Sequence, residues 1–183
     1  MDALEALRTR RTVSTFASEA PPLAAIERAL EAATWAPNHH LTEPWRFHVL
    51  VGAARDDLAT AICETLPPEK DTAEERASVL KKIGRAPVLV VVTQTGDASD
   101  PVRYLEDYAA CACATQNLLL TAHAEGLAGK WSTGKLAHSE GARQYLGLGP
   151  DDRIVAYVYL GYAASSTAAE PRRSAPITTW RGN

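Results

Sequence analysis

The chain has 183 residues, of which 46% are hydrophobic and 22% are charged, a composition typical of one compact globular domain. Its formal net charge of -3 supplies no overall positive field for nucleic acid or for an anionic membrane surface. Small molecules and protein partners are therefore the expected ligands.

Membrane insertion and disulfide cross-linking are both disfavoured. The longest purely apolar run, residues 87–92, is far shorter than the roughly 20 residues of a membrane-spanning helix, and we identify no signal peptide. Cys63, Cys111 and Cys113 are an odd number of cysteines in a chain large enough to fold without cross-links. We expect a cytoplasmic protein, with Cys111 and Cys113 as small core residues.

The first half of the chain begins with two predicted helices and a strand. Asp2 can cap a helix that runs to Arg10, and Pro22 opens a second helix that ends before Pro37. Residues 45–51 alternate apolar side chains with partly apolar ones, which predicts a strand covered on both faces.

The middle of the chain has a less regular pattern. A short helix is predicted near residues 56–65. The polar stretch 66–72 and the charged residues up to Arg85 predict the most mobile internal region. The β-branched run 88–93 predicts a buried strand, and residues 154–160 predict a last strand before Gly161.

A long helix is predicted over residues 103–125, and Gly126 supplies its C-terminal stop. Apolar side chains at helical spacing and many alanines leave little polar surface on it, so it is either a central core helix or the seam of a dimer. The tail, 163–183, has little periodicity but carries Ile177 and Trp180. These two apolar side chains suggest a tail that wraps a partner.

The order of the predicted elements does not form successive βαβ units, and no internal repeat is present. The fold class is therefore α+β. We expect a single domain over residues 1–183, with 163–183 as a C-terminal extension.

A basic cluster, Arg-Thr-Arg-Arg-Thr, occupies residues 8–12 at the end of the first predicted helix. Guanidinium groups beside hydroxyls and free backbone N–H groups suit a phosphate dianion. The alternative is that these cations only complement the dipole at the C-terminus of that helix.

A second unusual segment, residues 36–45, reads Ala-Pro-Asn-His-His-Leu-Thr-Glu-Pro-Trp. It places amide, imidazole, carboxylate and indole groups between two prolines that restrict the backbone, which indicates a shaped binding loop. Adjacent histidines rarely face one metal from an extended segment, and no set of ligands at zinc-like spacing accompanies them, so we expect no metal site. An ordinary loop histidine is the alternative for His39.

The third segment, residues 126–135, reads Gly-Leu-Ala-Gly-Lys-Trp-Ser-Thr-Gly-Lys. Its glycines let a backbone approach a ligand, and its hydroxyl and ammonium groups can bond a polar edge. The glycine spacing fits neither a P-loop nor a dinucleotide fingerprint. A turn between a core helix and a short strand explains the segment equally well.

Taken in order, these segments resemble the nitroreductase family of FMN-dependent oxidoreductases. Residues 10–16, Arg-Arg-Thr-Val-Ser-Thr-Phe, resemble its RRS-x-R-x-F motif. Residues 35–47 resemble its A-P-S/D-x-x-N/H-x-Q-P-W-x-F loop, and residues 124–131 resemble its A-x-G-L-G-x-x-W stretch. The chain length and His39 are similar to those of the small bacterial branch.

The resemblance implies a nitroreductase-like fold, with a central mixed sheet flanked by helices, and an intertwined homodimer that binds one FMN at each of two interface sites. It implies that the phosphate and neighbouring groups are held by Arg10, Arg11 and Thr12. It implies that the same flavin is reached from the other chain by Trp35 and His39, and again from the first chain by Trp131, Ser132 and Thr133. It also places the nicotinamide nucleotide near Thr121, Ala122, His123, Ala124, Glu125 and Gly126.

Three residues depart from the family pattern. Thr15 stands where a second phosphate-facing arginine is common, and Arg172 or Arg173 in the tail is the candidate replacement. Glu43 replaces a glutamine, and Lys130 replaces the small residue that precedes the tryptophan. These last two changes are expected to affect the choice of substrate.

The chemistry expected from the residues agrees with this resemblance. A flavin carries out hydride and electron transfer itself, which explains why the sequence offers no nucleophilic triad, acid pair or metal cluster. We expect no catalytic side chain, and a ping-pong reaction from NADH or NADPH through FMN to a nitroaromatic, quinone or similar small electrophile. The alternatives are a non-catalytic flavin- or nucleotide-binding store or sensor, and an RNA-binding module, which the acidic balance disfavours.

Overall fold

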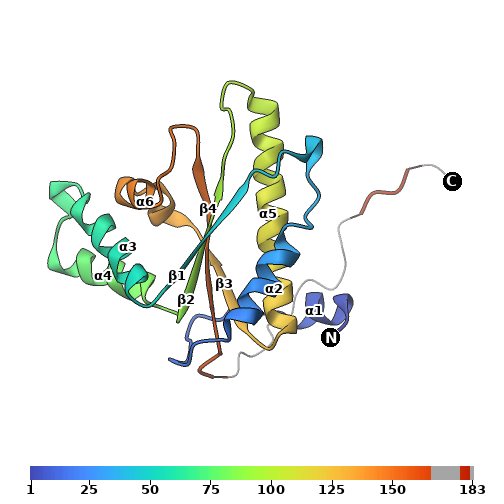
Figure 1. Cartoon of the computed structure of the whole chain (residues 1–183), viewed down its shortest axis with the longest axis horizontal. Helices are drawn as coiled ribbons and strands as arrows, with labels where there is room; N and C mark the ends of the chain where they lie inside the picture. The colour runs from blue at the N-terminus through green and yellow to red at the C-terminus, as the bar shows by residue number, and fades with distance from the viewer. Residues whose placement is uncertain (166–177, 182–183) are drawn as a thin grey trace.

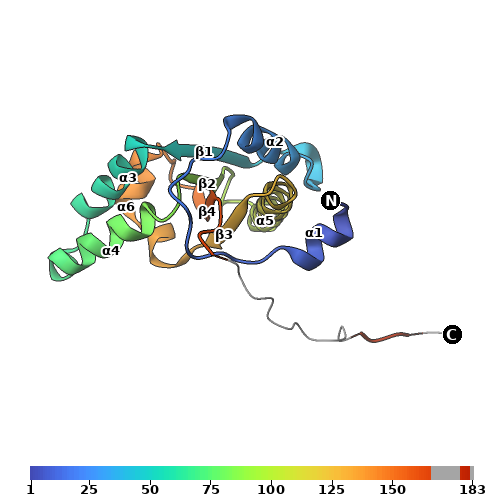
Figure 2. The same cartoon turned by 90° about the horizontal axis from the view of Figure 1, so that it is seen from below.

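A four-stranded sheet lies between two layers of helices (Figures 1 and 2). The structure is a computed structural model that describes residues 1–165 and 178–181. Its α-helices are α1 (Ala3–Thr9), α2 (Leu23–Ala33), α3 (Ala53–Glu64), α4 (Ala73–Ile83), α5 (Pro101–Ala124) and α6 (Glu140–Tyr145). Its strands are β1 (Trp45–Val51), β2 (Val88–Gln94), β3 (Ala128–Ser132) and β4 (Arg153–Gly161), and its 3-10 helices are η1 (His39–Leu41), η2 (Pro68–Lys70) and η3 (Gly134–His138).

The sheet has the strand order β1-β2-β4-β3, and each neighbouring pair is antiparallel. The α+β class is confirmed, but the expected mixed sheet needs correction. Within the described residues, parallel pairing is limited to one isolated bridge between Thr12 and Gly129. For β1 and β2 the physical reason is their connection. The chain passes through α3 and α4 and returns to the end of the sheet that it left, where Val51 pairs with Val88, so the two strands run antiparallel.

The apolar core lies on both faces of the sheet because β2 and β4 are buried on both sides. Val88, Val90 and Val92 of β2 face α2 and α5, whereas Leu89 and Val91 face the layer of α3, α4 and α6. This alternation is the period of two that a strand imposes on its side chains. The prediction of a fully buried strand from its β-branched run is therefore confirmed.

Helix α5 presents a buried stripe to the sheet and to α2, which includes Ala110, Cys111, Leu118 and Ala122. The core-helix interpretation is confirmed for this stripe. The prediction for Cys113 is wrong because its side chain points away from the stripe and is exposed. No helix in the described part of the chain combines the length and apolar character needed to cross a bilayer.

The stretch expected to be the most mobile contains a regular helix, α4. Thr72 caps it by accepting a hydrogen bond from the backbone N–H of Glu75, and Val79 and Ile83 bury one side of it. The many charged side chains lie on the solvent side of an amphipathic helix, so they do not indicate a loop. The sequence pattern did not predict this helix, and the mobility of the region stays a prediction.

The tail prediction falls largely outside the described residues, because Ile177, Arg172 and Arg173 are among those that the structure does not describe. Trp180 is described and is 88% exposed. The wrapping of a partner by the tail stays a prediction.

Substitution of Gly141 by alanine is expected to lower the free energy of unfolding by about 1–3 kcal/mol. Gly141 lies in α6, and a Cβ atom there would stand 1.9 Å from the backbone oxygen of Ala61 in α3. Helix propensity alone would favour alanine by about 1 kcal/mol, so a loss of stability identifies the clash as the cause. The measurement is urea unfolding, with Gly149→Ala as the control because its Cβ would meet only the Asp152 side chain, at 3.5 Å. Equal stability of the two variants would contradict the predicted packing.

Candidate functional site

The segment of residues 10–16 runs beside β3, although the two are more than a hundred positions apart in the sequence. Helix α1 ends at Thr9, and Arg10 turns the chain out of the helix with an extended ψ of 130°. Thr12 then pairs with Gly129, and the N–H of Val13 donates to the Gly129 carbonyl at 3.2 Å. The first and third predicted segments are therefore adjacent in space.

Arg11 holds the turn that leads into this segment. Its Nη1 donates to the carbonyls of Arg8 at 2.7 Å and Arg10 at 2.9 Å. Its Nε is buried without a partner, which leaves one donor of the guanidinium available to a ligand. Arg8 is exposed in the last turn of α1, where the helix-dipole interpretation fits it, whereas Arg10 and Arg11 lie beyond the helix.

His123, near the end of α5, connects this cluster to the core. Its Nε2 lies 2.8 Å from the Thr9 hydroxyl. Burial lowers the pKa of His123, and the positive charges of Arg10 and Arg11 lower this pKa further. The structure therefore favours a neutral imidazole here, beside cations whose field acts on this end of α5.

The predicted residues Trp131, Ser132 and Thr133 follow Gly129 along and just beyond β3. Trp131 pairs with Val158 of β4 and packs against the core on the α2 and α5 side. Thr133 is exposed where the chain leaves the strand. The structure thus brings the predicted phosphate residues and these three residues to one edge of the sheet.

The predicted nucleotide-binding stretch, residues 121–126, forms the last turn of α5 and its cap. Ala122 is fully buried in the core. Glu125 accepts two hydrogen bonds from Arg28 of α2, at 2.8 and 2.6 Å, and this contact lowers the pKa of its carboxyl group. Gly126 ends the helix with a φ of +83°. Part of the stretch is therefore engaged in packing, and its contact with a nucleotide stays a prediction.

The loop of residues 36–45 is shaped by its own polar side chains. The Asn38 Oδ1 accepts from the N–H of Glu43 at 2.7 Å, and its Nδ2 donates to the Thr42 hydroxyl at 2.9 Å. The Thr42 hydroxyl in turn donates to the carboxylate of Asp107, buried in α5, at 2.5 Å. These bonds hold the backbone of His40, Leu41 and Glu43 at positive φ, a conformation that non-glycine residues seldom adopt. The expectation of a shaped loop is confirmed.

The two histidines of this loop stack on each other, with ring centroids 3.8 Å apart. The Nδ1 of His39 lies 2.8 Å from a carboxylate oxygen of Glu106 in α5. The ligand atoms of His39, His40 and Glu106 all lie within 4.8 Å of one another, although all three side chains are open to solvent. The expectation of an extended segment was wrong, because η1 folds the histidines into a turn.

The predicted residues of one chain do not all meet at one place. His39 pairs with Glu106 near the start of α5, whereas Thr9 bonds His123 near its end (Figure 1). Residues 106 and 123 are 17 positions apart, which corresponds to about 25 Å along an α-helix. Trp35 follows α2 and is 79% exposed. The Trp35 and His39 side chains therefore face solvent, and His39 lies away from the basic cluster of its own chain.

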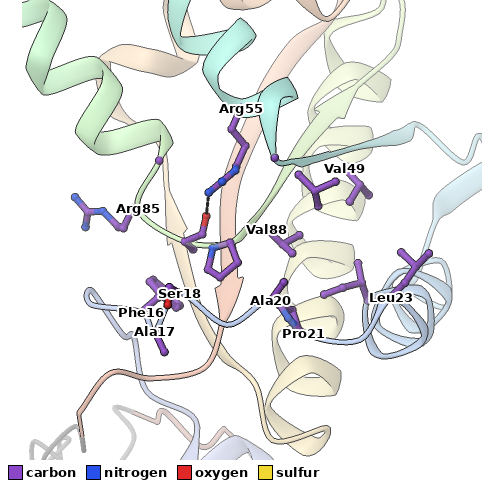
Figure 3. A pocket seen from close by; sticks show the side chains of 16 residues that line it. Phe16, Ala17, Ser18, Ala20, Pro21, Leu23, Val49, Arg55, Arg85 and Val88 are labelled. Atoms are coloured by element: carbon purple, nitrogen blue, oxygen red, sulfur yellow. Dashed lines mark hydrogen bonds between the residues drawn. The ribbon is translucent and has the colours of Figure 1, made fainter.

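A hollow of about 750 Å³ lies between residues 16–26, the end of β1 and the residues that lead into β2 (Figure 3). It is lined mainly by apolar side chains, such as Leu23 and Val49, and the Arg55 side chain donates to the Ala86 carbonyl at its wall. None of the predicted site residues lines it. Size alone does not identify the candidate site in this chain.

One contact near the candidate site was not predicted from the sequence. The Nζ of Lys130 on β3 donates to the Ser14 hydroxyl at 3.2 Å. The only signal in the sequence was that Lys130 departs from the family pattern.

Comparisons with known proteins identify the family to which this chain is similar. The sequence model of a protein family, described as "Nitroreductase family", matches residues 7–162 of this chain. The chain is 33% identical over 174 residues to "Putative NAD(P)H nitroreductase YfhC" of Bacillus subtilis (strain 168). The aligned region covers 93% of this chain and 88% of that protein. A crystal structure of a nitroreductase-like family protein from Bacillus cereus is 30% identical, with a TM-score of 0.85 over 97% of this chain and 92% of that chain. A structure from Desulfovibrio desulfuricans solved in complex with FMN is 25% identical, with a TM-score of 0.70 over 93% of this chain and 91% of that chain.

Proposed function

We propose a function from the premise that this chain belongs to the nitroreductase family, whose model matches residues 7–162. The chain is an NAD(P)H-dependent flavin oxidoreductase with FMN as its cofactor. The name of one relative and the FMN bound in one similar solved structure support this assignment. Its electrons pass from NADH or NADPH through the flavin to a nitroaromatic, quinone or similar small electrophile. The observation that carries this proposal is the pairing of Thr12 with Gly129, which joins the basic cluster to β3.

The residues at this junction fit an FMN phosphate. The pKa of His123 is lowered by burial and then by Arg10 and Arg11, so their positive charge acts on this region. The Arg11 Nε is a buried donor without a partner, and a phosphate oxygen would satisfy it. We propose Arg10, Arg11 and Thr12 for the phosphate and Trp131, Ser132 and Thr133 for the rest of the flavin.

A second chain completes the proposed site. His39, which lies beside Glu106 near the start of α5, is too far from the basic cluster near the end of that helix to share one flavin with it within one chain. Exposed apolar side chains on α1 and α5, Leu4, Leu7 and Leu105, favour an interface between copies. We therefore propose a homodimer in which Trp35 and His39 reach the flavin held by the partner.

The bound flavin supplies the hydride and electron transfer. The residues of this chain bind the phosphate, cover the ring and exclude water, and no side chain is assigned a proton transfer. His39 is proposed to shape the pocket, with its ring orientation held by Glu106. Since the nicotinamide nucleotide and the acceptor use the same exposed flavin face, they bind in turn, and ping-pong kinetics follow.

Rapid mixing of the flavin-loaded protein with NADH or NADPH tests this proposal. We expect at least one nucleotide to bleach the flavin absorbance, and a nitroaromatic or quinone to restore it when mixed with the reduced protein. Steady-state rates should give parallel double-reciprocal lines, because one site alternates between two partners. Bound flavin that neither nucleotide bleaches would instead identify a store or sensor.

A further inference from the structure

The hollow of about 750 Å³ shown in Figure 3 has no part in the proposed function. Small-molecule sites in proteins commonly have volumes of roughly 300–1,000 Å³, so the hollow has room for a small ligand. None of the residues proposed for the phosphate, the flavin ring or the nicotinamide nucleotide lines it. A ligand bound here would therefore be an additional one.

Most of the wall of this hollow is apolar. Leu23 at the start of α2 and Val51 at the end of β1 line it and are 65% and 53% exposed. Val49 lines it as well, together with Ile26 and Val88 of the core. Removal of such apolar surface from water is favourable. The hollow therefore fits a ligand with an apolar body.

The charge in the hollow has one sign. Among the described residues that line it, Arg55 and Arg85 are the charged ones, and no carboxylate is present. Neither arginine forms a salt bridge within the described part of the chain. Arg55 donates to the carbonyl of Ala86, as Figure 3 shows, but its buried Nε has no partner among the described residues. Since a guanidinium group has five N–H donors, Arg55 has donors left for an anion in the hollow.

The position of Arg55 is not explained by the helix that carries it. Arg55 lies in the first turn of α3, and the N-terminus of a helix carries a partial positive charge that disfavours a cation. Arg85, by contrast, follows Gly84 at the C-terminus of α4, where a cation is favoured. A negative group in the hollow would offset the unfavourable charge of Arg55. A carboxylate is suited to this role, because its two oxygens match the planar guanidinium group.

We propose that this hollow binds a small amphipathic carboxylate. The carboxylate pairs with Arg55, and Arg85 adds positive potential on the same hollow. The apolar body of the ligand lies against Leu23, Val51 and the core residues beside them. This inference goes beyond the proposed function and does not depend on it, because the two sets of residues differ.

The test is calorimetric titration of the purified full-length protein with octanoate and with octanamide, a neutral molecule with the same apolar body. We expect octanoate to bind about tenfold more tightly, because a hydrogen bond to a charged group is stronger than one between neutral groups. Arg55→Met should remove this preference by weakening octanoate binding and leaving octanamide binding unchanged. Arg103→Met is the matched control, because Arg103 has the third position of α5 as Arg55 has of α3, but lies outside the hollow. It should keep the preference.

Leu23→Ser tests the apolar wall without relying on the folding of the Arg55 variant. Because Leu23 is 65% exposed, its replacement should leave the fold intact. We expect octanoate and octanamide to bind more weakly by the same factor, about threefold or more, so that the preference for the carboxylate persists. Val102→Ser is the matched control, because Val102 is 68% exposed on α5 and lies outside the hollow. It should change neither affinity.

Two results would overturn the inference. The first is a wild-type protein that binds octanoate no more tightly than octanamide, or binds neither. The second is octanoate binding that Trp35→Ala weakens while Arg55→Met and Leu23→Ser leave it unchanged, which would place the ligand at the proposed flavin site.

Discussion

Replacement of Arg10 by alanine is expected to weaken FMN binding by about 10- to 100-fold, because a hydrogen bond to a charged group contributes about 1.5–3 kcal/mol. Arg10 lies just beyond α1, half-buried, and its charge is close enough to lower the pKa of His123. It therefore lies at the junction with β3 where the phosphate is proposed. The alanine variant keeps the backbone N–H that donates to the carbonyl of Ala6. A loss of FMN affinity is therefore caused by removal of the side chain.

Arg8→Ala is the matched control for this experiment. Arg8 has the same charge and is two positions away, but it is exposed in the last turn of α1. Its carbonyl, which accepts from Arg11, is unchanged by the substitution. Fluorescence titration of both apoproteins with FMN gives the two dissociation constants, and we expect a change of less than about threefold for Arg8→Ala. Equal losses would mean that the cluster acts only through its general charge.

The sequence predicted β1, β2 and β4 well, and for β2 and β4 burial on both faces leaves a continuous local signal. The expectation that β1 is covered on both faces was wrong, because several of its side chains are partly or fully exposed. The predicted bounds of β1 are those observed, and β2 extends only one residue beyond its predicted end. Helix α4 was missed because a run of charges was interpreted as a sign of mobility, although Val79 and Ile83 mark a buried side. Helix α6 has only six residues, too few for an amphipathic pattern to appear.

The site residues were predicted by resemblance, whereas their arrangement depends on contacts that leave no periodic signal. The bridge between Thr12 and Gly129 is a single backbone pairing between distant segments. The stacked histidines require a positive φ at His40, which a non-glycine residue rarely adopts. The hydrogen bond from Lys130 to Ser14 joins two residues 116 positions apart. Such contacts become visible only when the fold has placed the segments side by side.

A mixed dimer of Arg10→Ala and Trp35→Ala chains is expected to bind one FMN with the affinity of the wild type. In the proposed dimer, each site takes Arg10 from one chain and Trp35 from the other. One site of the mixed dimer then contains both substitutions, and the other contains neither. Each variant alone forms a dimer with two equally weakened sites. Because Trp35 is 79% exposed in the single chain, its removal should leave the fold of each chain intact.

The measurement is FMN titration of mixed dimers that carry a different affinity tag on each chain and are purified over both columns. The matched control is a dimer of one wild-type chain and one Arg10→Ala/Trp35→Ala chain, in which both sites contain one substitution each. We expect a biphasic titration, with one wild-type site, for the first mixed dimer and two weakened sites for the control. If Arg10 and Trp35 of the same chain held one flavin, the two results would be exchanged, because the wild-type chain of the control would keep an intact site. The pair of titrations therefore decides between a site shared by two chains and a site within one chain.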